Sequence, residues 1–307
     1  MLGLLRLRTL LLLAVVLAVA YGGISWVFSE KLIAPQARPL GKVDPADYGL
    51  PQPAVVQVPG KGVELASWYF ANPRHEHCAV IMLHGFGGAR AEVVGAAPIF
   101  WDRGCDLLMY DSRGHGDSSP ALLTFGPHEK EDLVAAIAWL SRRTKLPDRR
   151  IGLIGWSYGA AVSIQAAAKV PDIGFVIADS SYSSLGDIAR VQADHQFGSW
   201  AKIFVPGALF VAGKRAGFDP GTASPVAAIR HVKAPVLLIH SRQDGFTPYQ
   251  HSETIYAASD KARTRIVIPS WPAPHAESFR KNPAGYTKIV DRFITEFKLP
   301  VGPRKAA

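Results

Sequence analysis

The sequence predicts an α/β fold in which a mostly parallel central sheet carries helices on both faces. The chain has 307 residues, of which 48% are hydrophobic and 19% charged, as expected for a globular protein with one large domain. After residue 53, short and continuously apolar runs alternate with segments of helical spacing. This alternation is typical of parallel strands buried on both faces. Glycine-rich and polar segments directly follow several apolar runs, which places them at the carboxyl edge of the sheet, where such folds bind ligands.

Residues 1–28 are predicted to be an N-terminal membrane anchor or a signal peptide, outside the fold. Arg6 and Arg8 precede the uncharged run Thr9–Phe28, which as a helix spans about 30 Å and can cross a bilayer core. Ala18-Val19-Ala20 has the small-x-small form of a signal cleavage site. Because the apolar run continues past this site, we favour a retained single-pass anchor. A short basic N-terminal tail before one apolar run is the layout of an export signal, so we expect the folded domain outside the cytoplasm. A secreted or periplasmic protein, released by cleavage, is the alternative.

Residues 29–53 are predicted to be a connector, residues 54–298 the folded domain and residues 299–307 a basic tail. Prolines at five positions deny the connector a regular helix or central strand: Pro35, Pro39, Pro45, Pro51 and Pro53. The net charge is +9. Since no nucleic-acid-binding motif and no basic stripe with interleaved aromatic residues accompanies it, we expect no nucleic-acid partner.

The elements of the domain follow from its apolar runs and their spacing. The predicted strands are 54–58, 63–70, 78–83, 105–110, 151–154, 175–178, 236–239 and 265–268. The predicted helices are 89–101, 129–142, 158–170 and 284–297. The segment at about 181–231 is longer than an ordinary crossover and is predicted to be a small helical cap.

Ser157 is the candidate nucleophile. It is the central residue of Gly155-Trp156-Ser157-Tyr158-Gly159, which lies between a predicted strand and a predicted helix. That context is the one a nucleophile elbow requires, because a tight turn lifts the serine oxygen to the helix N-terminus. Without that context, the motif would indicate only a glycine-rich packing turn.

A nucleophilic serine needs a base and a carboxylate that orients the base. Asp244 follows the strand 236–239, and His275 lies between the last strand and the last helix. Both therefore come after Ser157 in the order serine, acid, histidine. The weaker candidates are the acids Asp260 and Glu277 and the histidines His195, His240 and His251.

Two backbone N–H groups are predicted to form an oxyanion hole, which stabilises negative charge on a reacting carbonyl oxygen. One belongs to Tyr158, directly after the nucleophile. The other is assigned to Phe86 in His84-Gly85-Phe86-Gly87-Gly88, because this flexible segment follows the strand 78–83. An ordinary glycine-rich turn is the alternative for the second segment.

Over about residues 54–298 the sequence resembles the α/β-hydrolase superfamily. Within it, the chain is most similar to small-capped serine aminopeptidase-like and monoacylglycerol lipase-like hydrolases, several of which carry an N-terminal membrane helix. The matching segments are 84–88, 110–118, 155–159, 224–225, 235–244 and 275–277. The resemblance implies a structural role for the loop 111–118, including Asp111 and His115. Ser241 and the segment 245–248 depart from the usual pattern around the acid.

A serine nucleophile predicts acyl transfer through an acyl-enzyme, with no metal and no cofactor. We expect a hydrolase of carboxylic esters with lipophilic acyl groups, acting on a small-molecule substrate. An amidase or aminopeptidase with the same triad is the alternative, and a non-catalytic binding protein is less favoured. An aminopeptidase would need an acidic site for the substrate amine. The apolar side of the cap either receives an acyl chain or packs on the domain, and no oligomeric state is predicted.

Cys78 and Cys105 open two strands that are neighbours in this fold. Neighbouring strands lie about 4.8 Å apart, a separation that a disulfide can bridge. In an exported protein the two residues either form a disulfide or remain buried thiols.

Overall fold

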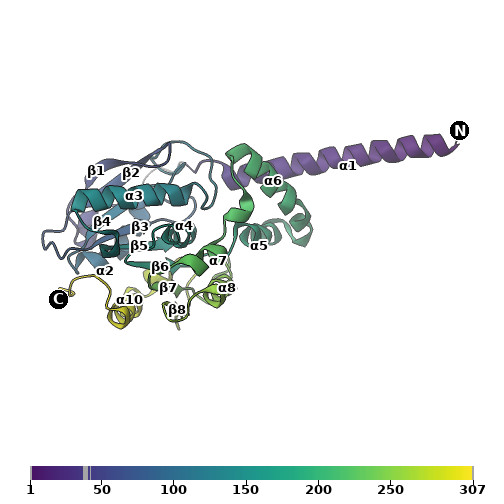
Figure 1. The fold of residues 1–307 in the computed structure, drawn as a ribbon. Helices are drawn as coiled ribbons and strands as arrows, with labels where there is room; N and C mark the ends of the chain where they lie inside the picture. The colour runs from purple at the N-terminus through teal and green to yellow at the C-terminus, as the bar shows by residue number, and fades with distance from the viewer. Residues whose placement is uncertain (1, 37–40, 42, 306–307) are drawn as a thin grey trace.

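The computed structural model describes residues 2–36, 41 and 43–305. Residues 37–40 and 42 of the predicted connector and residues 306–307 of the predicted tail lie outside the described residues. The chain forms a layered α/β domain from which one long N-terminal helix projects (Figure 1). The domain therefore has the predicted architecture, with the membrane-length segment outside its core.

An eight-stranded sheet forms the centre of the domain, in the order β1-β2-β4-β3-β5-β6-β7-β8. Its strands are β1 (Ala54–Pro59), β2 (Glu64–Phe70), β3 (Ala79–Leu83), β4 (Asp106–Tyr110), β5 (Ile151–Trp156), β6 (Phe175–Asp179), β7 (Val236–Ile239) and β8 (Thr264–Val267). β1 and β2 pair antiparallel, β2 pairs antiparallel with β4, and the remaining neighbours are parallel. The prediction of a mostly parallel sheet is confirmed.

Helices cover both faces of the sheet because its strands are apolar on both sides. The helices are α1 (Leu2–Ile33), α2 (Pro98–Trp101), α3 (Glu129–Thr144), α4 (Tyr158–Ala167), α5 (Leu185–Phe197), α6 (Val205–Ala216), α7 (Pro225–Ala228), α8 (Gln250–Ala258), α9 (Ser278–Lys281) and α10 (Pro283–Phe297). Alternate residues of β3 belong to two different cores, with Ile81 on the side of α3, α4 and α8 and Met82 on the side of α2 and α10. This alternation is the two-sided burial expected of a parallel sheet.

The predicted helix 89–101 is not continuous in the structure. A 3₁₀ segment, Arg90–Ala96, precedes the short helix α2. Pro98 has no N–H to donate to the preceding turn, but it is well suited to the first turn of a helix. The 3₁₀ segment therefore ends before Pro98, and α2 begins there.

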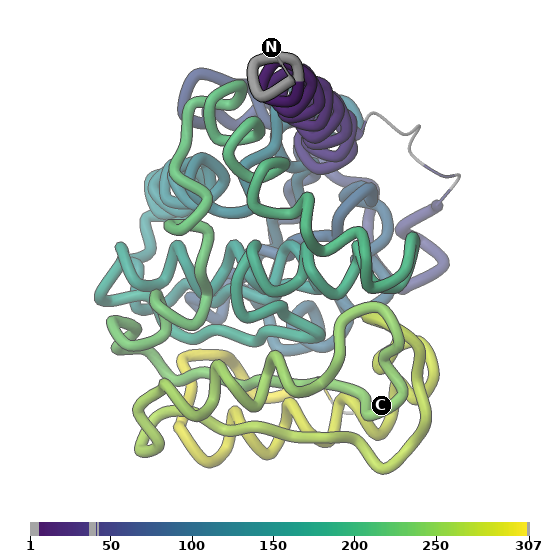
Figure 2. The backbone as a smooth tube through the Cα atoms, turned by 90° about the vertical axis from the view of Figure 1, so that its right-hand side faces the viewer, coloured from purple at the N-terminus to yellow at the C-terminus, as the bar shows by residue number. Residues whose placement is uncertain are grey.

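The first helix, α1, is longer than the predicted membrane segment and runs through Ile33. It ends close to Pro35, which disfavours helical geometry in the residue before it. The part Arg6–Ile33 is long and apolar enough to cross a membrane, by length and composition. Its last turns lie against the cap, which consists of α5, the 3₁₀ segment Ser199–Phe204 and α6. Figure 2 shows α1 nearly end-on, with the cap beside it at one end of the molecule.

The two cysteines are joined in a disulfide between residues that directly precede β3 and β4. The Cα atoms of Cys78 and Cys105 are 4.6 Å apart, and both side chains are buried in the core beneath α2 and α10. The bridge therefore links two adjacent strands at the edge of the sheet opposite Ser157.

Candidate active site

Ser157 lies in a strained turn between β5 and α4. Its backbone has φ 54° and ψ −112°, a conformation that costs a non-glycine residue about 1–3 kcal/mol. A side chain at Gly155 would collide with the backbone of Gly159, and one at Gly159 would lie 2.6 Å from the carbonyl oxygens of Leu83 and His84. Glycine is therefore required at both flanking positions. The Ser157 N–H donates to the Asp179 carbonyl oxygen at 2.7 Å, which ties the turn to the end of β6.

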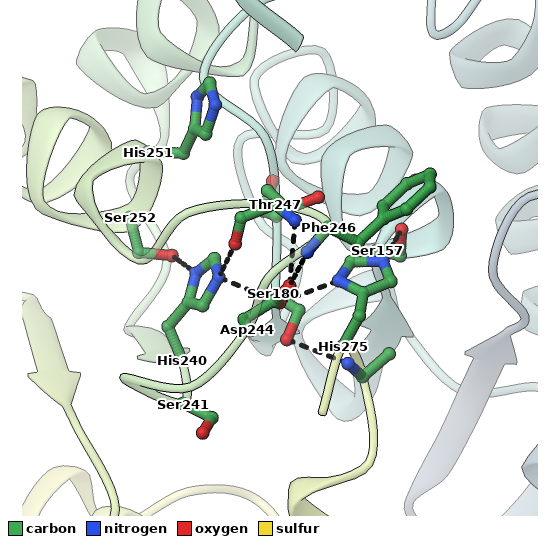
Figure 3. Close-up of polar contacts among 12 residues, drawn as sticks. Ser157, Ser180, His240, Ser241, Asp244, Phe246, Thr247, His251, Ser252 and His275 are labelled. Atoms are coloured by element: carbon green, nitrogen blue, oxygen red, sulfur yellow. Dashed lines mark hydrogen bonds and ion pairs between the residues drawn. The ribbon is translucent and has the colours of Figure 1, made fainter. Parts of the chain in front are cut away.

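The structure brings His275 and Asp244 to Ser157, in the predicted order (Figure 3). His275 Nε2 lies 2.7 Å from Ser157 Oγ, and His275 Nδ1 lies 2.7 Å from Asp244 Oδ2. With the imidazole neutral, Nδ1–H donates to the carboxylate and Nε2 accepts from the serine hydroxyl. The three side chains come from loops that follow β5, β7 and β8, at the carboxyl edge of the sheet.

Asp244 is held as a carboxylate by four hydrogen bonds. Its Oδ1 accepts from the backbone N–H groups of Phe246 at 3.0 Å and Thr247 at 2.8 Å. Its Oδ2 accepts from His275 and from His240 Nε2 at 3.1 Å. Burial alone would raise the Asp244 pKa, but the hydrogen bonds from His240, His275 and Thr247 outweigh it and hold the pKa well below its usual range. Asp244 is thus ionised whenever the protein is folded at neutral pH.

His240 was a weaker candidate for the base, and the structure places it against the acid instead. Its Nε2 also lies 2.7 Å from the Thr247 carbonyl oxygen, and its Nδ1 lies 2.7 Å from Ser252 Oγ. These partners fix the ring so that Nε2–H points to both Thr247 and Asp244. His240 therefore steadies the acid from the side opposite His275.

The two departures around the acid have defined places in the site. Ser241 Oγ accepts from the N–H groups of Gln243 and Ala273, each at 3.2 Å, and so links the acid loop to the histidine loop. The Phe246 ring lies 4.9 Å from the His275 ring, at an interplanar angle of 37°. Both residues restrict the position of His275 relative to Asp244.

A second buried acid, Asp179 at the end of β6, supports the loop that carries His275. Asp179 Oδ1 accepts from Ser180 Oγ at 2.9 Å, and Ser180 Oγ accepts from the Ala276 N–H at 3.2 Å. Ser180 and Ala276 have φ values of 57°, so this contact joins two strained residues. Burial raises the Asp179 pKa to about 6, although Ser180, His240, His275 and Tyr286 partly offset the effect. No sequence motif had indicated Asp179.

The rival candidates have other partners. Asp260 is exposed and forms an ion pair with Arg263 at 3.3 Å, and Glu277 pairs with Arg280 at 2.5 Å. Of the other histidines, His251 Nδ1 lies 2.8 Å from Ser183 Oγ, and His195 lies in the cap helix α5. The geometry thus favours Asp244 and His275 over the alternatives.

The two residues assigned to the oxyanion hole lie beside Ser157. Tyr158 is the first residue of α4, and the first N–H groups of a helix have no partner within it. A Cβ on Gly85 would lie 3.6 Å from Ser157 Cβ, so the loop that carries Phe86 passes directly against the serine. His84 Nδ1 lies 2.7 Å from the Gly85 carbonyl oxygen and holds this loop. Complete burial lowers the His84 pKa to about 3, so the ring is neutral.

Two cavities meet at Ser157, and Phe86 and Phe246 also line both. The first, of about 170 Å³, extends under the cap and is mainly apolar; its walls include Phe28, Leu32, Tyr182, Ile188, Phe197 and Val205. The second, of about 680 Å³, is more polar; its walls include His84, Glu92, His275, Glu277 and Arg280. Ser157 therefore has an apolar cavity on one side and a more polar cavity, called the polar cavity below, on the other.

In the part of the chain that the structure describes, no group of three or more His, Cys, Asp or Glu side chains is placed to hold a metal ion. Within the loop after β4, Asp111 accepts from the Arg90 N–H at 2.6 Å and forms an ion pair with the Arg90 guanidinium. This is the structural role that the resemblance implied.

Comparison with known proteins agrees with the fold. A family model described as alpha/beta hydrolase fold matches residues 79–217. The uncharacterized protein YqkD of Bacillus subtilis is 29% identical over 230 residues, which cover 74% of each chain. The uncharacterized protein Rv2307c of Mycobacterium tuberculosis is 28% identical over 296 residues, 95% of this chain and 96% of the relative.

Solved structures with the same fold include hydrolases of two kinds. The Pyrococcus furiosus esterase Pf2001 matches with a TM-score of 0.68 and 25% identity, over 86% of this chain and 98% of the esterase. The Pyrococcus horikoshii acylaminoacyl peptidase matches with a TM-score of 0.60 and 19% identity, over 81% of this chain and 42% of the peptidase, a similarity of fold alone. These matches confirm the predicted α/β-hydrolase superfamily, and the esterase neighbour supports a hydrolase activity.

Proposed function

We propose that the protein is a serine hydrolase of carboxylic esters with lipophilic acyl groups, in which Ser157, His275 and Asp244 form a catalytic triad. The observation that carries this proposal is the hydrogen-bonded chain from Asp244 through His275 to Ser157, which ends where an apolar cavity opens. A serine with a base in contact and an ionised orienting acid is the arrangement that activates a hydroxyl for attack on a carbonyl carbon.

The proposed reaction has two halves. His275 Nε2 takes the Ser157 proton as Oγ attacks the ester carbonyl, and the N–H groups of Tyr158 and Phe86 stabilise the oxyanion. His275 then gives the proton to the leaving alcohol, and an acyl-enzyme remains on Ser157. In the second half, His275 takes a proton from water, the resulting attack releases the acid, and Ser157 regains its proton. No other reactant is needed.

The two cavities divide the substrate between them. The leaving oxygen must lie close to His275 Nε2 to receive its proton, and His275 lines the polar cavity but not the apolar one. The alcohol part is therefore assigned to the polar cavity, and the acyl part to the apolar cavity. This arrangement supports a lipophilic acyl group over a charged one.

The same assignment disfavours an aminopeptidase. The free amine of its substrate would lie on the acyl side of the scissile bond and would need a carboxylate there. Lys31 is the one charged residue among the described residues that line the apolar cavity, and none of them is an acid. A positive charge in that position repels an ammonium group.

Labelling with a fluorophosphonate tests the nucleophile. We expect the wild type and the control Ser163→Ala to be labelled and Ser157→Ala to remain unlabelled. Ser163 is a buried serine of the same helix whose hydroxyl donates to the Gly159 carbonyl oxygen. Equal labelling of wild type and Ser157→Ala would overturn the assignment. A panel of p-nitrophenyl esters beside aminoacyl anilides then separates esterase from aminopeptidase activity.

We also propose that α1 is a retained membrane anchor and that the catalytic domain lies outside the cytoplasm. The large apolar side chains of α1 from Leu7 to Val19 are more than half exposed, which is unfavourable in water and favourable in a bilayer. Carbonate extraction and the intact mass of the protein test whether α1 is retained as an anchor. Release from the membrane and a mass that corresponds to cleavage after Ala20 would support the secreted alternative.

A further inference from the structure

The apolar cavity at Ser157 has one wall that does not come from the hydrolase domain or its cap. Phe28, Lys31 and Leu32 of α1 line it, together with residues of α5 and α6. Phe28 and Leu32 are four residues apart and so lie on the same face of the helix. The last two turns of the N-terminal helix thus form part of the space next to the nucleophile.

A second, adjacent face of the same turns packs against the cap and the hydrolase domain. Ser25, Ser29 and Ile33 repeat every four residues, and all three are buried. The Leu123 N–H donates to the Ile33 carbonyl oxygen at 2.9 Å, which fixes the end of the helix to the domain. Phe28 and Leu32 therefore have a defined position in the wall.

The cap makes further contacts with the same part of α1. The Phe28 ring stacks on Phe197 of α5, with ring centres 5.1 Å apart. The Arg215 guanidinium of α6 lies 4.3 Å from the centre of the Trp26 ring and forms an ion pair with Glu30. The Arg215 contacts lie on either side of Phe28 along the helix and hold its backbone in place, while Phe197 holds its ring.

Close approach of the two helices depends on a glycine of the cap. A Cβ at Gly207 of α6 would lie 2.7 Å from Tyr21 Cε1 and would collide with the Ser25 hydroxyl. The Tyr21 hydroxyl donates to the Ile203 carbonyl oxygen at 3.1 Å. The sequence of the cap is thus fitted to the helix that it packs against.

We propose that the last two turns of α1 are part of the acyl-binding site and that Phe28 and Leu32 limit the length of the acyl chain. The ligand is the straight alkyl chain of an ester, because the surrounding side chains are mainly apolar. This inference rests on the proposed ester hydrolysis and adds a specificity-determining role for a segment otherwise assigned to anchoring. Cleavage after Ala20 would leave both residues in place, so the inference applies to either form of the protein.

The test uses the full-length protein in detergent micelles and two series of increasing alkyl length. One series is p-nitrophenyl esters, measured as kcat/KM. The other is p-nitrophenyl alkylphosphonates, measured as the rate constant for inactivation, which requires a reactive serine but no ester turnover. Each methylene group that leaves water contributes about fourfold to either constant, so both rise with chain length until the chain meets a wall.

Three variants locate that wall. We expect Phe28→Ala to extend the rise by about two methylenes, a gain of roughly 16-fold at that length, and Phe28→Trp to end it at shorter chains. The matched control is Val27→Ala, since Val27 is the neighbouring residue of the same helix and is 53% exposed. It should keep the wild-type profile. If thermal unfolding shows that Phe28→Ala is misfolded, Phe28→Leu replaces it.

The two series separate failure of this inference from failure of the proposed function. If esters are cleaved but the chain length at which the rise ends is the same in all Phe28 variants, the inference is wrong and the esterase proposal stands. If no ester is cleaved but the phosphonate profile shifts with residue 28, the esterase proposal is wrong and the role of α1 stands.

Discussion

Replacing Asp244 by asparagine tests the proposed triad most directly, because the change is nearly isosteric. The asparagine oxygen can still accept from the N–H groups of Phe246 and Thr247. Its NH₂ group would then take the position of Oδ2, which faces both His275 Nδ1 and His240 Nε2. An amide nitrogen can only donate, so His275 would have to accept at Nδ1 and carry its proton on Nε2. In that tautomer it cannot take the proton of Ser157.

A serine hydrolase with the histidine in the wrong tautomer loses about 10⁴-fold in kcat, which corresponds to about 5.4 kcal/mol of transition-state stabilisation. We expect a loss of this size for Asp244→Asn on a p-nitrophenyl ester, and a comparable slowing of fluorophosphonate labelling. Asp260→Asn is the control, because Asp260 is the rival acid and is exposed. It should retain wild-type activity. Activity of Asp244→Asn within tenfold of wild type would refute the reasoning.

The same variant has a stability signature with a definite sign. The pKa of Asp244 is lowered in the folded state, so its carboxylate stabilises the fold above the unfolded pKa of about 3.9. This contribution is lost as the pH falls toward the folded-state value. Asp244→Asn should therefore be less stable than wild type at pH 7, with a difference that shrinks below about pH 4. Urea unfolding at several pH values measures it, and a constant difference would contradict the assignment of charge.

Three further changes give independent tests. Asp179→Asn should stabilise the fold by up to about 3 kcal/mol at pH 8 and by little at pH 4. The Asp179 pKa rises from 3.8 to about 6 on folding, so wild-type stability falls as the pH rises through that window. Urea unfolding that shows no gain for the variant at pH 8 would contradict this. Cys78→Ser opens the bridge to Cys105 and should cost about 3–4 kcal/mol for a separation of 27 residues, and two free thiols in denatured, unreduced wild type would refute the bridge. Gly207→Val should push α6 from Tyr21 and lower kcat/KM for long-chain esters but not for p-nitrophenyl acetate; equal losses on both would argue against a wall formed by α1.

The fold could be predicted from the sequence because its strands are buried on both faces. The run 236–239 has the same bounds in the structure, and the others differ at their ends by one or two residues. Failures occur where the backbone is set by local sterics that hydrophobic spacing does not encode. The segment 89–101 breaks at Pro98, and α1 continues to Ile33 because nothing before Pro35 stops a helix.

The three residues of the candidate triad could be predicted because each directly follows a strand whose position in the sheet is fixed by chain order. Their supporting residues could not be predicted in this way. His240 and Asp179 are brought to the site only after β6 and β7 are paired. Asp179 belongs to no motif, and the matching segment 235–244 gave no supporting role to His240. A buried polar residue at a strand end is a weak signal alone, since many such residues serve only the local fold.

The substrate side was the least predictable part because its sequence had two equally good interpretations. The apolar residues of the cap were expected either to receive an acyl chain or to pack on the domain. Phe197 and Val205 line the apolar cavity, and the Phe204 ring stacks on Tyr21 of α1 at 5.2 Å. Apolar residues of the cap therefore line the cavity and also pack against α1, the segment predicted to be a membrane anchor. The sequence of an apolar helix of membrane length is the same whether the helix only spans a bilayer or also ends in a binding site. Only the contacts of its last turns distinguish the two roles.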